Sequence, residues 1–98
     1  MVYDVMGGNF MDSYGIAAFR SRQAVLRFDD LMRKAGLITH IITTPRAVSM
    51  GCGLSVRFDR SAMPIAMELQ RSHPSPSFIG FYNATWQDDR VRVSPVRG

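Results

Sequence analysis

The apolar pattern between residues 21 and 36 constrains the fold of this chain most, because it predicts a helix with both ends defined. Apolar residues recur there at helical spacing: Ala24, Phe28, Leu31, Met32 and Ala35. Ser21 offers an N-cap before them. Gly36 follows basic residues, in the position that favours glycine after a last helical turn. The short apolar run before the helix, residues 14–19, is suited to a buried strand.

Three further segments are typical of strands. Residues 37–43 are rich in isoleucine and threonine, residues 54–58 alternate, and residues 77–82 form an apolar run after a proline-rich turn. With the helices, the order is β-α-β-β-α-β. It predicts an α+β fold of the ferredoxin-like type, a βαββαβ two-layer sandwich with two helices on one face of a four-stranded antiparallel sheet.

The second helix is expected to run from a cap at Asp59 or Ser61 to about residue 71. Pro64 favours Ser61 as the cap, since proline is tolerated in the first helical turn but not deeper. Apolar residues inside this segment recur at helical spacing and predict its buried side.

At 98 residues the chain has the size of one domain. We expect residues 1–13 to be a flexible leader, residues 14–83 to be the folded domain, and residues 84–98 to be a C-terminal extension. Within the extension, residues 90–93 predict either an added edge strand or a basic tail.

The chain is basic, with a net charge of +4, and eleven of its twelve basic residues are arginine. Such a surface attracts nucleic acid, phosphates or an acidic protein. The arginines are scattered and no aromatic RNA-binding motif accompanies them, so we do not expect nucleic acid as a partner. The apolar runs are too short to span a bilayer, so no membrane partner is expected. A lone cysteine is suited to the reducing cytoplasm, the compartment that we expect.

Cys52, the only cysteine, lies between Gly51 and Gly53 in a loop that begins after Pro45. The two glycines remove bulk and permit positive φ, so the thiol can stand at the tip of a tight loop. Arg46 could fold over and favour the thiolate, which is the reactive form. The alternative is an inert cysteine that begins the next strand, since unpaired cysteine often behaves as a small hydrophobe.

Metal and redox-pair chemistry are not expected. The chain has no second cysteine for an intramolecular bridge, and His40 and His73 lack the spacing of a zinc site. No glycine-rich phosphate loop or serine–histidine arrangement is visible, so no cofactor is expected either.

The loop and its flanking strands resemble the bacterial selenium/sulfur carrier-like family over residues 15–82. The family signature has Pro-Arg, a serine three residues after the arginine, then Cys-Gly and an apolar–Arg–Phe strand. This sequence matches that signature at seven positions: Pro45, Arg46, Ser49, Cys52, Gly53, Arg57 and Phe58.

The resemblance implies that Cys52 accepts sulfur or selenium as a persulfide from a donor protein and passes it to an acceptor protein. Arg46 would then be its electrostatic partner, and Gly51 and Gly53 would leave space for the extra atom. Their backbone N–H groups could hold the anionic persulfide. Without a general base near the thiol, we expect a carrier without turnover of its own.

Two further residues of the signature have open roles. Ser49 either donates a hydrogen bond at the site or holds the turn together. Arg57 joins the site only if strand alternation places it on the same side, and a solvated arginine on the strand face is the alternative.

Two other functions remain open from the residues alone. One is a ferredoxin-like interaction or regulatory module in which Cys52 is incidental and the arginine-rich surface makes the contacts. The other is a redox sensor whose thiol forms sulfenic acid or an intermolecular disulfide.

Overall fold

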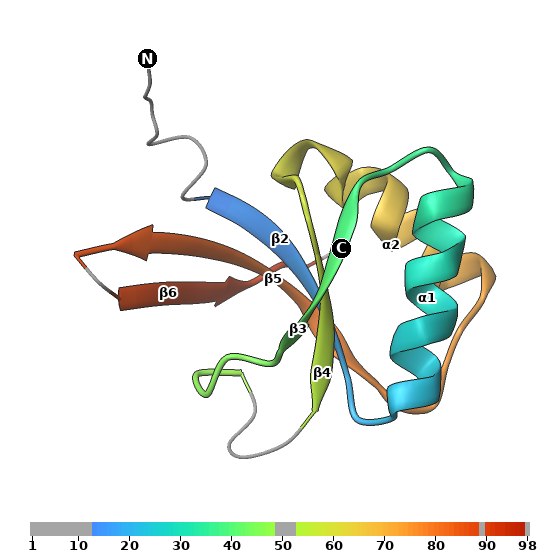
Figure 1. Ribbon diagram of the computed structural model, residues 1–98, viewed down its shortest axis with the longest axis horizontal. Coiled ribbons are helices and arrows are strands. Elements are labelled where there is room, and N and C mark those ends of the chain that lie inside the picture. The colour runs from blue at the N-terminus through green and yellow to red at the C-terminus, as the bar shows by residue number, and fades with distance from the viewer. Residues whose placement is uncertain (1–12, 49–52, 89, 98) are drawn as a thin grey trace.

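The protein is an α+β domain in which two helices cover one face of a five-stranded antiparallel sheet (Figure 1). The structure, a computed structural model, describes residues 13–48, 53–88 and 90–97. Within these residues, no helix has the length and apolar character needed to cross a membrane. The helices are α1, Arg22–Lys34, and α2, Met63–Ser72.

The sheet has the strand order β3-β4-β2-β5-β6. Its strands are β2 (Ser13–Phe19), β3 (Thr39–Thr43), β4 (Leu54–Phe58), β5 (Phe78–Gln87) and β6 (Arg90–Pro95). Because β4 lies between β2 and β3, the crossover through α1 joins two strands that are not neighbours. The loop between β3 and β4 therefore leaves the sheet at the same end as the start of α1 (Figure 1).

The prediction of four strands was wrong, because the sheet has a fifth. β6 pairs with β5 from Tyr82 opposite Pro95 to Gln87 opposite Arg90. Of the two alternatives predicted for residues 90–93, an added edge strand or a basic tail, the edge strand is therefore confirmed. The physical reason is the alternation of β6, in which half-buried valines follow exposed arginines and pack on the sheet.

Helix α1 has the two ends predicted from its sequence. The Ser21 hydroxyl accepts a hydrogen bond from the backbone N–H of Ala24 at 3.3 Å. At the other end Gly36 has φ of +88°, and its N–H donates to the Arg33 carbonyl at 2.9 Å. The N–H of Leu37 donates to the Met32 carbonyl at 3.1 Å, which completes a Schellman motif.

Helix α2 begins differently from the prediction, which named Asp59 or Ser61 as its cap. Its N-cap position is Ala62, which makes no side-chain cap bond, whereas Asp59 caps the 3-10 turn before it. The Asp59 carboxylate accepts from the N–H of Ser61 at 3.0 Å and also from the Ser61 hydroxyl. The bond from the hydroxyl, and to a smaller extent the bond from the backbone N–H, hold the pKa of Asp59 below its ordinary value of 3.8. A 3-10 turn over Arg60–Ala62 follows the cap and leads into α2, so Pro64 still lies in the first α-helical turn.

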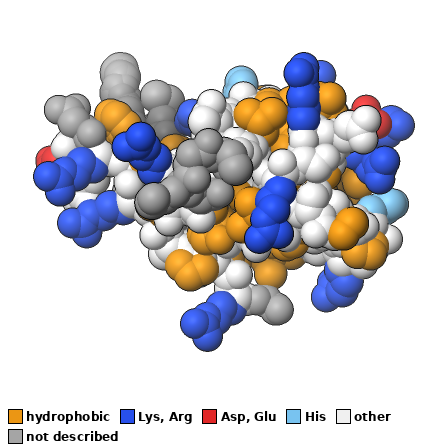
Figure 2. Space-filling model, turned by 90° about the horizontal axis from the view of Figure 1, so that it is seen from below, with side chains coloured by type: hydrophobic (Ala, Val, Ile, Leu, Met, Phe, Trp, Pro, Cys, Tyr) orange, Lys and Arg blue, Asp and Glu red, His pale blue; other side chains and the backbone are white. Residues whose placement is uncertain are grey.

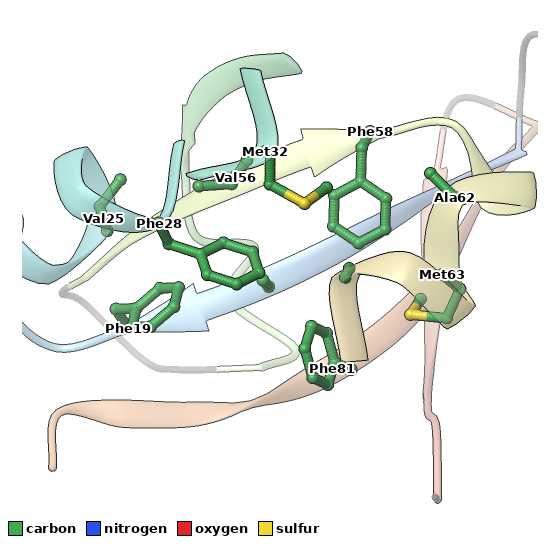
Figure 3. Packing of buried hydrophobic residues seen from close by; sticks show 11 residues of the cluster. Phe19, Val25, Phe28, Met32, Val56, Phe58, Ala62, Met63 and Phe81 are labelled. Atoms are coloured by element: carbon green, nitrogen blue, oxygen red, sulfur yellow. The ribbon is translucent and has the colours of Figure 1, made fainter. Parts of the chain in front are cut away.

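The main core lies between the helices and the sheet and is dominated by phenylalanine (Figure 3). The Phe19 and Phe28 rings have centroids 5.4 Å apart, and Phe78 and Phe81 have theirs 4.9 Å apart. All four rings are tilted relative to their neighbours, the arrangement that aromatic pairs prefer. Met32 fills the space beside them and has no exposed surface.

The other face of the sheet, which we call the open face, has no helix over it among the residues that the structure describes (Figure 1). Even so, Ile16, Ala18 and Ala84 on this face are fully buried. Their cover comes from partly buried side chains of the strands and of the β3–β4 loop: Tyr14, Ile42, Val48, Ile79, Tyr82, Val91 and Val93. The open face is therefore apolar, and its outer layer is only half shielded from water.

Candidate functional site

The predicted site lies in the loop between β3 and β4. The structure describes this loop up to Val48 and again from Gly53. Three predicted site residues, Ser49, Gly51 and Cys52, lie outside the described residues. The site is therefore built from the two ends of the loop and from the surface around them.

The base of the loop is closed by two hydrogen bonds. The backbone N–H of Thr44 donates to the Gly53 carbonyl at 3.2 Å. The hydroxyl oxygens of Thr44 and Ser55 are 2.7 Å apart, and both residues are buried. A buried hydroxyl is costly unless it is hydrogen-bonded, so the pair stabilises only the arrangement in which the two ends of the loop meet.

Gly53 is required at this base for a steric reason. Its φ is +110°, a conformation that side chains with a Cβ rarely adopt. A Cβ at this position would also lie 3.0 Å from the carbonyl oxygen of Phe19 and 3.3 Å from Oγ1 of Thr44. From the sequence, Gly53 was interpreted as a residue that leaves the Cys52 thiol accessible. The structure adds that the loop can close against β2 only with glycine here.

Arg46 is exposed in a turn at the first end of the loop. The N–H of Val48 donates to the Pro45 carbonyl at 2.9 Å and closes this turn. Val48 then packs against the buried cluster of the open face. The loop is thus tied to the open face and not to the helical layer (Figure 1).

The structure does not bring Arg57 to the base of the loop. On β4 it pairs with His40 of β3 and Ile16 of β2, three residues beyond the pair that Leu54 makes with Thr43. Its guanidinium carbon lies 4.1 Å from the centroid of the Tyr14 ring, a cation–π contact. Arg57 therefore lines an open groove toward the other end of the sheet, together with Ser13, Tyr14, Ile38, His40, Phe58 and Asp59.

Sequence reasoning missed the paired hydroxyls of Thr44 and Ser55. The signal that could have found them is their position, because each stands beside the loop on one of its flanking segments. Their pairing follows from the β3–β4 register, in which Thr43 is opposite Leu54. Only that register says that the two residues approach one another.

Three exposed or partly exposed arginines lie in or next to the segments at the loop end of the sheet: Arg20, Arg22 and Arg46. Figure 2 views this end and shows many Lys and Arg side chains but few Asp and Glu. In the described part of the chain, the ion pairs join residues of the same helix: Asp29 with Arg33, Asp30 with Lys34, and Glu68 with Arg71. Arg20, Arg22 and Arg46 have no such partner among the described residues, so their charge favours anions at this end.

The described residues contain no group of three His, Cys, Asp or Glu side chains that could hold a metal ion. His40 lies on β3 beside Arg57. His73 lies at the end of α2, where its Nδ1 is 3.2 Å from the Leu69 carbonyl oxygen. The two histidines thus belong to different layers of the molecule.

Comparison with known proteins gives one match. Neither the search of curated proteins nor the search of solved structures found a match. The family model described as "Putative Se/S carrier protein-like" matches residues 14–75. The match covers nearly two thirds of the chain, from β2 to the end of α2, and includes the whole β3–β4 loop with Cys52. The chain therefore belongs to this Se/S carrier-like family.

Proposed function

We propose that this protein carries sulfur or selenium as a persulfide on Cys52. The observation that supports the proposal is the family match, since the matched segment contains the only cysteine of the chain. In the loading step, the Cys52 thiolate attacks the outer chalcogen atom of a donor persulfide. The donor's S–S or S–Se bond breaks, the donor thiolate leaves, and Cys52 holds the outer atom with no net oxidation.

The closed loop base supports this role by defining where the loop leaves the sheet. Cys52 is joined directly to Gly53, whose carbonyl accepts from Thr44 and whose Cα faces the Phe19 carbonyl. A fixed base limits the positions that a reactive group on a short loop can reach. Delivery to an acceptor then depends on how a partner approaches this end of the sheet.

The arginines at the loop end support the ionised thiol. Positive charge nearby favours the thiolate over the thiol, and the negatively charged persulfide gains from the same field. We assign this role first to Arg46, which lies in the loop, with Arg20 and Arg22 adding to the local potential. Ser49 and the backbone N–H groups of Gly51 and Gly53 remain proposed supports, and Arg57 acts at a distance or only on the fold.

We also infer that the first four strands have the ferredoxin-like arrangement. The support is their order, with β2 between β4 and β5 and with β3 at the edge beside β4. In this view β6 is an addition to the last strand. The protein would act in the cytoplasm, where a free thiol stays reduced.

The decisive test is labelling of Cys52 with a cysteine desulfurase and cysteine, followed by intact-mass spectrometry without reductant. Wild-type protein should gain about 32 mass units for sulfur, or about 80 when the donor is supplied with selenocysteine. The C52S variant should gain nothing. Equal labelling of wild type and variant would contradict the proposal.

A second function, an interaction module with an incidental cysteine, is favoured by one observation, the exposure of Trp86 at 46%. Large exposed aromatic side chains are typical of protein interfaces. Alkylation by iodoacetamide at neutral pH separates the two functions. Rapid alkylation of the folded protein, slowed in Arg46→Gln, supports the carrier. Alkylation that begins only on unfolding supports the interaction module.

A further inference from the structure

The two edges of the sheet differ in how they are protected against pairing with another strand. At one edge, β6 has exposed Arg90 and Arg92 and ends at Pro95. Charged side chains and proline on an edge strand discourage such pairing. At the other edge, β3 has no Lys, Arg, Asp, Glu or Pro from Thr39 to Thr43. The β3 edge can therefore accept a further strand.

The pairing of β3 with β4 shows which backbone groups are free at this edge. The N–H of Thr44 donates to the Gly53 carbonyl at 3.2 Å, so Thr44 directs its backbone groups toward β4. In antiparallel pairing this direction alternates from one residue to the next. Ile41 and Thr43 therefore direct their N–H and carbonyl groups to the free edge, and both residues are exposed. These groups are available for hydrogen bonds to another strand.

Exposed apolar side chains gather at the same edge. In the described part of the chain, five large apolar side chains are exposed, and three of them lie here: Leu26 (48%), Ile38 (82%) and Ile41 (41%). Ile41 is opposite Val56 of the main core, so its side chain is on the helical side of the sheet. Leu26 comes one turn before Asp29, whose carboxylate accepts from the Thr39 hydroxyl of β3. Because α1 and β3 run in opposite directions (Figure 1), Leu26 is displaced from Asp29 toward Ile41.

We propose that β3 pairs with β3 of a second copy of this chain, about a two-fold axis that passes through Ile41. A two-fold axis makes the two copies of one strand antiparallel, and the two sheets become one. Ile41 is then opposite Ile41 of the second copy, and each N–H donates to the carbonyl of the other. Ile38 is opposite Thr44 of the second copy, at the base of its β3–β4 loop. This pairing does not depend on the carrier function.

The position of Leu26 favours a second copy over an extended peptide from another protein. Leu26 belongs to α1 and stands above the strand, so a single added strand would leave it uncovered. A second copy brings its own α1, with its own Leu26 and Ile41, to the same place. The apolar side chains at the edge are thus covered by their own equivalents.

The spacing of the helices allows this arrangement. α1 contacts β2, β3 and β4, and β4 is the middle one of these strands in the sheet. In the joined sheet the two β4 strands are three strand spacings apart, about 14 Å. Helices that pack directly are about 8–10 Å apart, so the two α1 helices do not collide. The remaining space is filled by Leu26 and Ile41 from both copies.

The charges on α1 also match across the two-fold axis. Arg22 comes four residues before Leu26 and Asp30 four residues after it, on neighbouring positions of the helix surface. Because the two helices are antiparallel, Arg22 of each copy lies toward Asp30 of the other. Arg22 has no ion-pair partner among the described residues, whereas Asp30 pairs with Lys34 at the surface. Arg33, at the same end, is already paired within α1. The contact therefore brings opposite charges together.

The test measures the mass of the protein in solution by sedimentation equilibrium, in reductant so that Cys52 cannot join two copies. One strand and one helix side form a small interface, so we expect a dissociation constant in the micromolar range. Wild-type protein should pass from the mass of one chain to twice that mass between about 2 and 200 µM. A single-chain mass over this whole range would overturn the proposal.

Charge substitutions at the two-fold axis locate the interface. Ile41→Lys and Ile41→Glu each place two like charges opposite one another, so each variant alone should weaken dimerisation at least about tenfold. An equal mixture of the two variants should dimerise again, because Lys then faces Glu. The control is Ile65→Lys, the same change at an apolar side chain of α2 that is 44% exposed, and it should dimerise as wild type does.

Three results would contradict this interface: an Ile41 variant that dimerises like wild type, a mixture that stays monomeric, or a control that is weakened equally. Circular dichroism checks that the variants are folded. If an Ile41 variant is unfolded, Leu26→Ser decides, because this side chain is half exposed on α1. Leu26→Ser should weaken dimerisation about tenfold, and a wild-type dissociation constant for it would overturn the proposal.

Discussion

The two faces of the sheet are built from the same strands but differ in what covers them. On the helical face, Phe19 and Phe81 of the strands pack against Phe28 of α1 in one core with residues of α2 (Figure 3). On the open face, the fully buried residues are smaller, and half-exposed side chains form the outer layer. The helical face therefore contributes most of the hydrophobic stabilisation, whereas the open face leaves more of its apolar surface exposed.

The difference extends to charge. Acidic residues on the helices are neutralised locally, and the carboxylate of Asp29 also accepts from the Thr39 hydroxyl. The open face has Arg57 stacked on Tyr14, whereas Arg46 is exposed in the turn of the β3–β4 loop. Local ion pairs at the helix surface stabilise the fold by little. On the open face, Asp59 lines the same groove as Arg57.

The largest expected effect tests whether stability is concentrated on the helical face. Phe28→Ala should lower the free energy of unfolding by about 3–5 kcal/mol, because it opens a cavity in a fully packed aromatic cluster. Trp86→Ala on the open face should cost about 1 kcal/mol or less, since the side chain is already 46% exposed. Urea denaturation followed by circular dichroism measures both.

Similar losses for these two substitutions would contradict the division between the faces. Phe28→Leu keeps most of the volume and should show an intermediate loss. It provides a usable comparison if the alanine variant is too unstable to fold.

A smaller effect on stability is expected from substituting two glycines that have positive φ, Gly36 after α1 and Gly53 before β4. Gly36→Ala, after α1, should cost about 1 kcal/mol for backbone strain alone, because no atom lies within 4 Å of the added Cβ. Gly53→Ala should cost more, since its Cβ would also meet the Phe19 carbonyl and Thr44. Gly53→Ala should further slow persulfide loading of Cys52, whereas Gly36→Ala should not.

The measurements are thermal or urea unfolding for stability and intact-mass spectrometry for loading. A Gly53→Ala variant as stable as Gly36→Ala, with normal loading, would show that the loop base tolerates opening. The closed base would then have no part in the carrier function.

The smallest expected effect concerns the cap before α2 and depends on pH. Hydrogen bonds from Ser61 lower the pKa of Asp59 in the folded protein, so its ionised form stabilises the fold above the unfolded value of 3.8. This contribution is lost as the pH falls through the lower folded value. Asp59→Ala should therefore reduce stability at pH 7, and the difference from wild type should narrow below about pH 4.

Unfolding at several pH values checks this prediction. Ser61→Ala removes the hydroxyl that lowers the pKa of Asp59 most. This variant should therefore lose part of the stability that ionised Asp59 adds at pH 7. A difference between Asp59→Ala and wild type that persists at pH 2 would mean that the carboxylate acts through its shape and not its charge.

Several features of the fold could be predicted because their signals lie within a few residues of one another. The cap at Ser21, the apolar spacing of α1 and the glycine after its last turn all act locally, and the structure has all three. The loop signature identified the family, since the residues concerned are close in sequence.

Other features depend on contacts between distant segments. Ser61 was preferred over Asp59 as the cap of α2 because of Pro64. In the structure Asp59 caps a 3-10 turn over Arg60–Ala62 instead, and Pro64 lies in the first turn of the α2 helix that follows. The fifth strand was one of two alternatives, since a short run of alternating valine and arginine forms a strand only when β5 is beside it.

The sequence by itself determined the two ends of α1, the presence of most strands and the family, because these depend on capping, periodicity and residues that are neighbours along the chain. Tertiary structure alone decided which residues meet across the sheet. It joined Thr44 to Ser55, placed Arg57 over Tyr14 away from the loop base, and left Trp86 exposed on the same face as Val48. Strand alternation gives the side on which a residue points, but register and strand order set its neighbours, and both arise from pairing between distant segments.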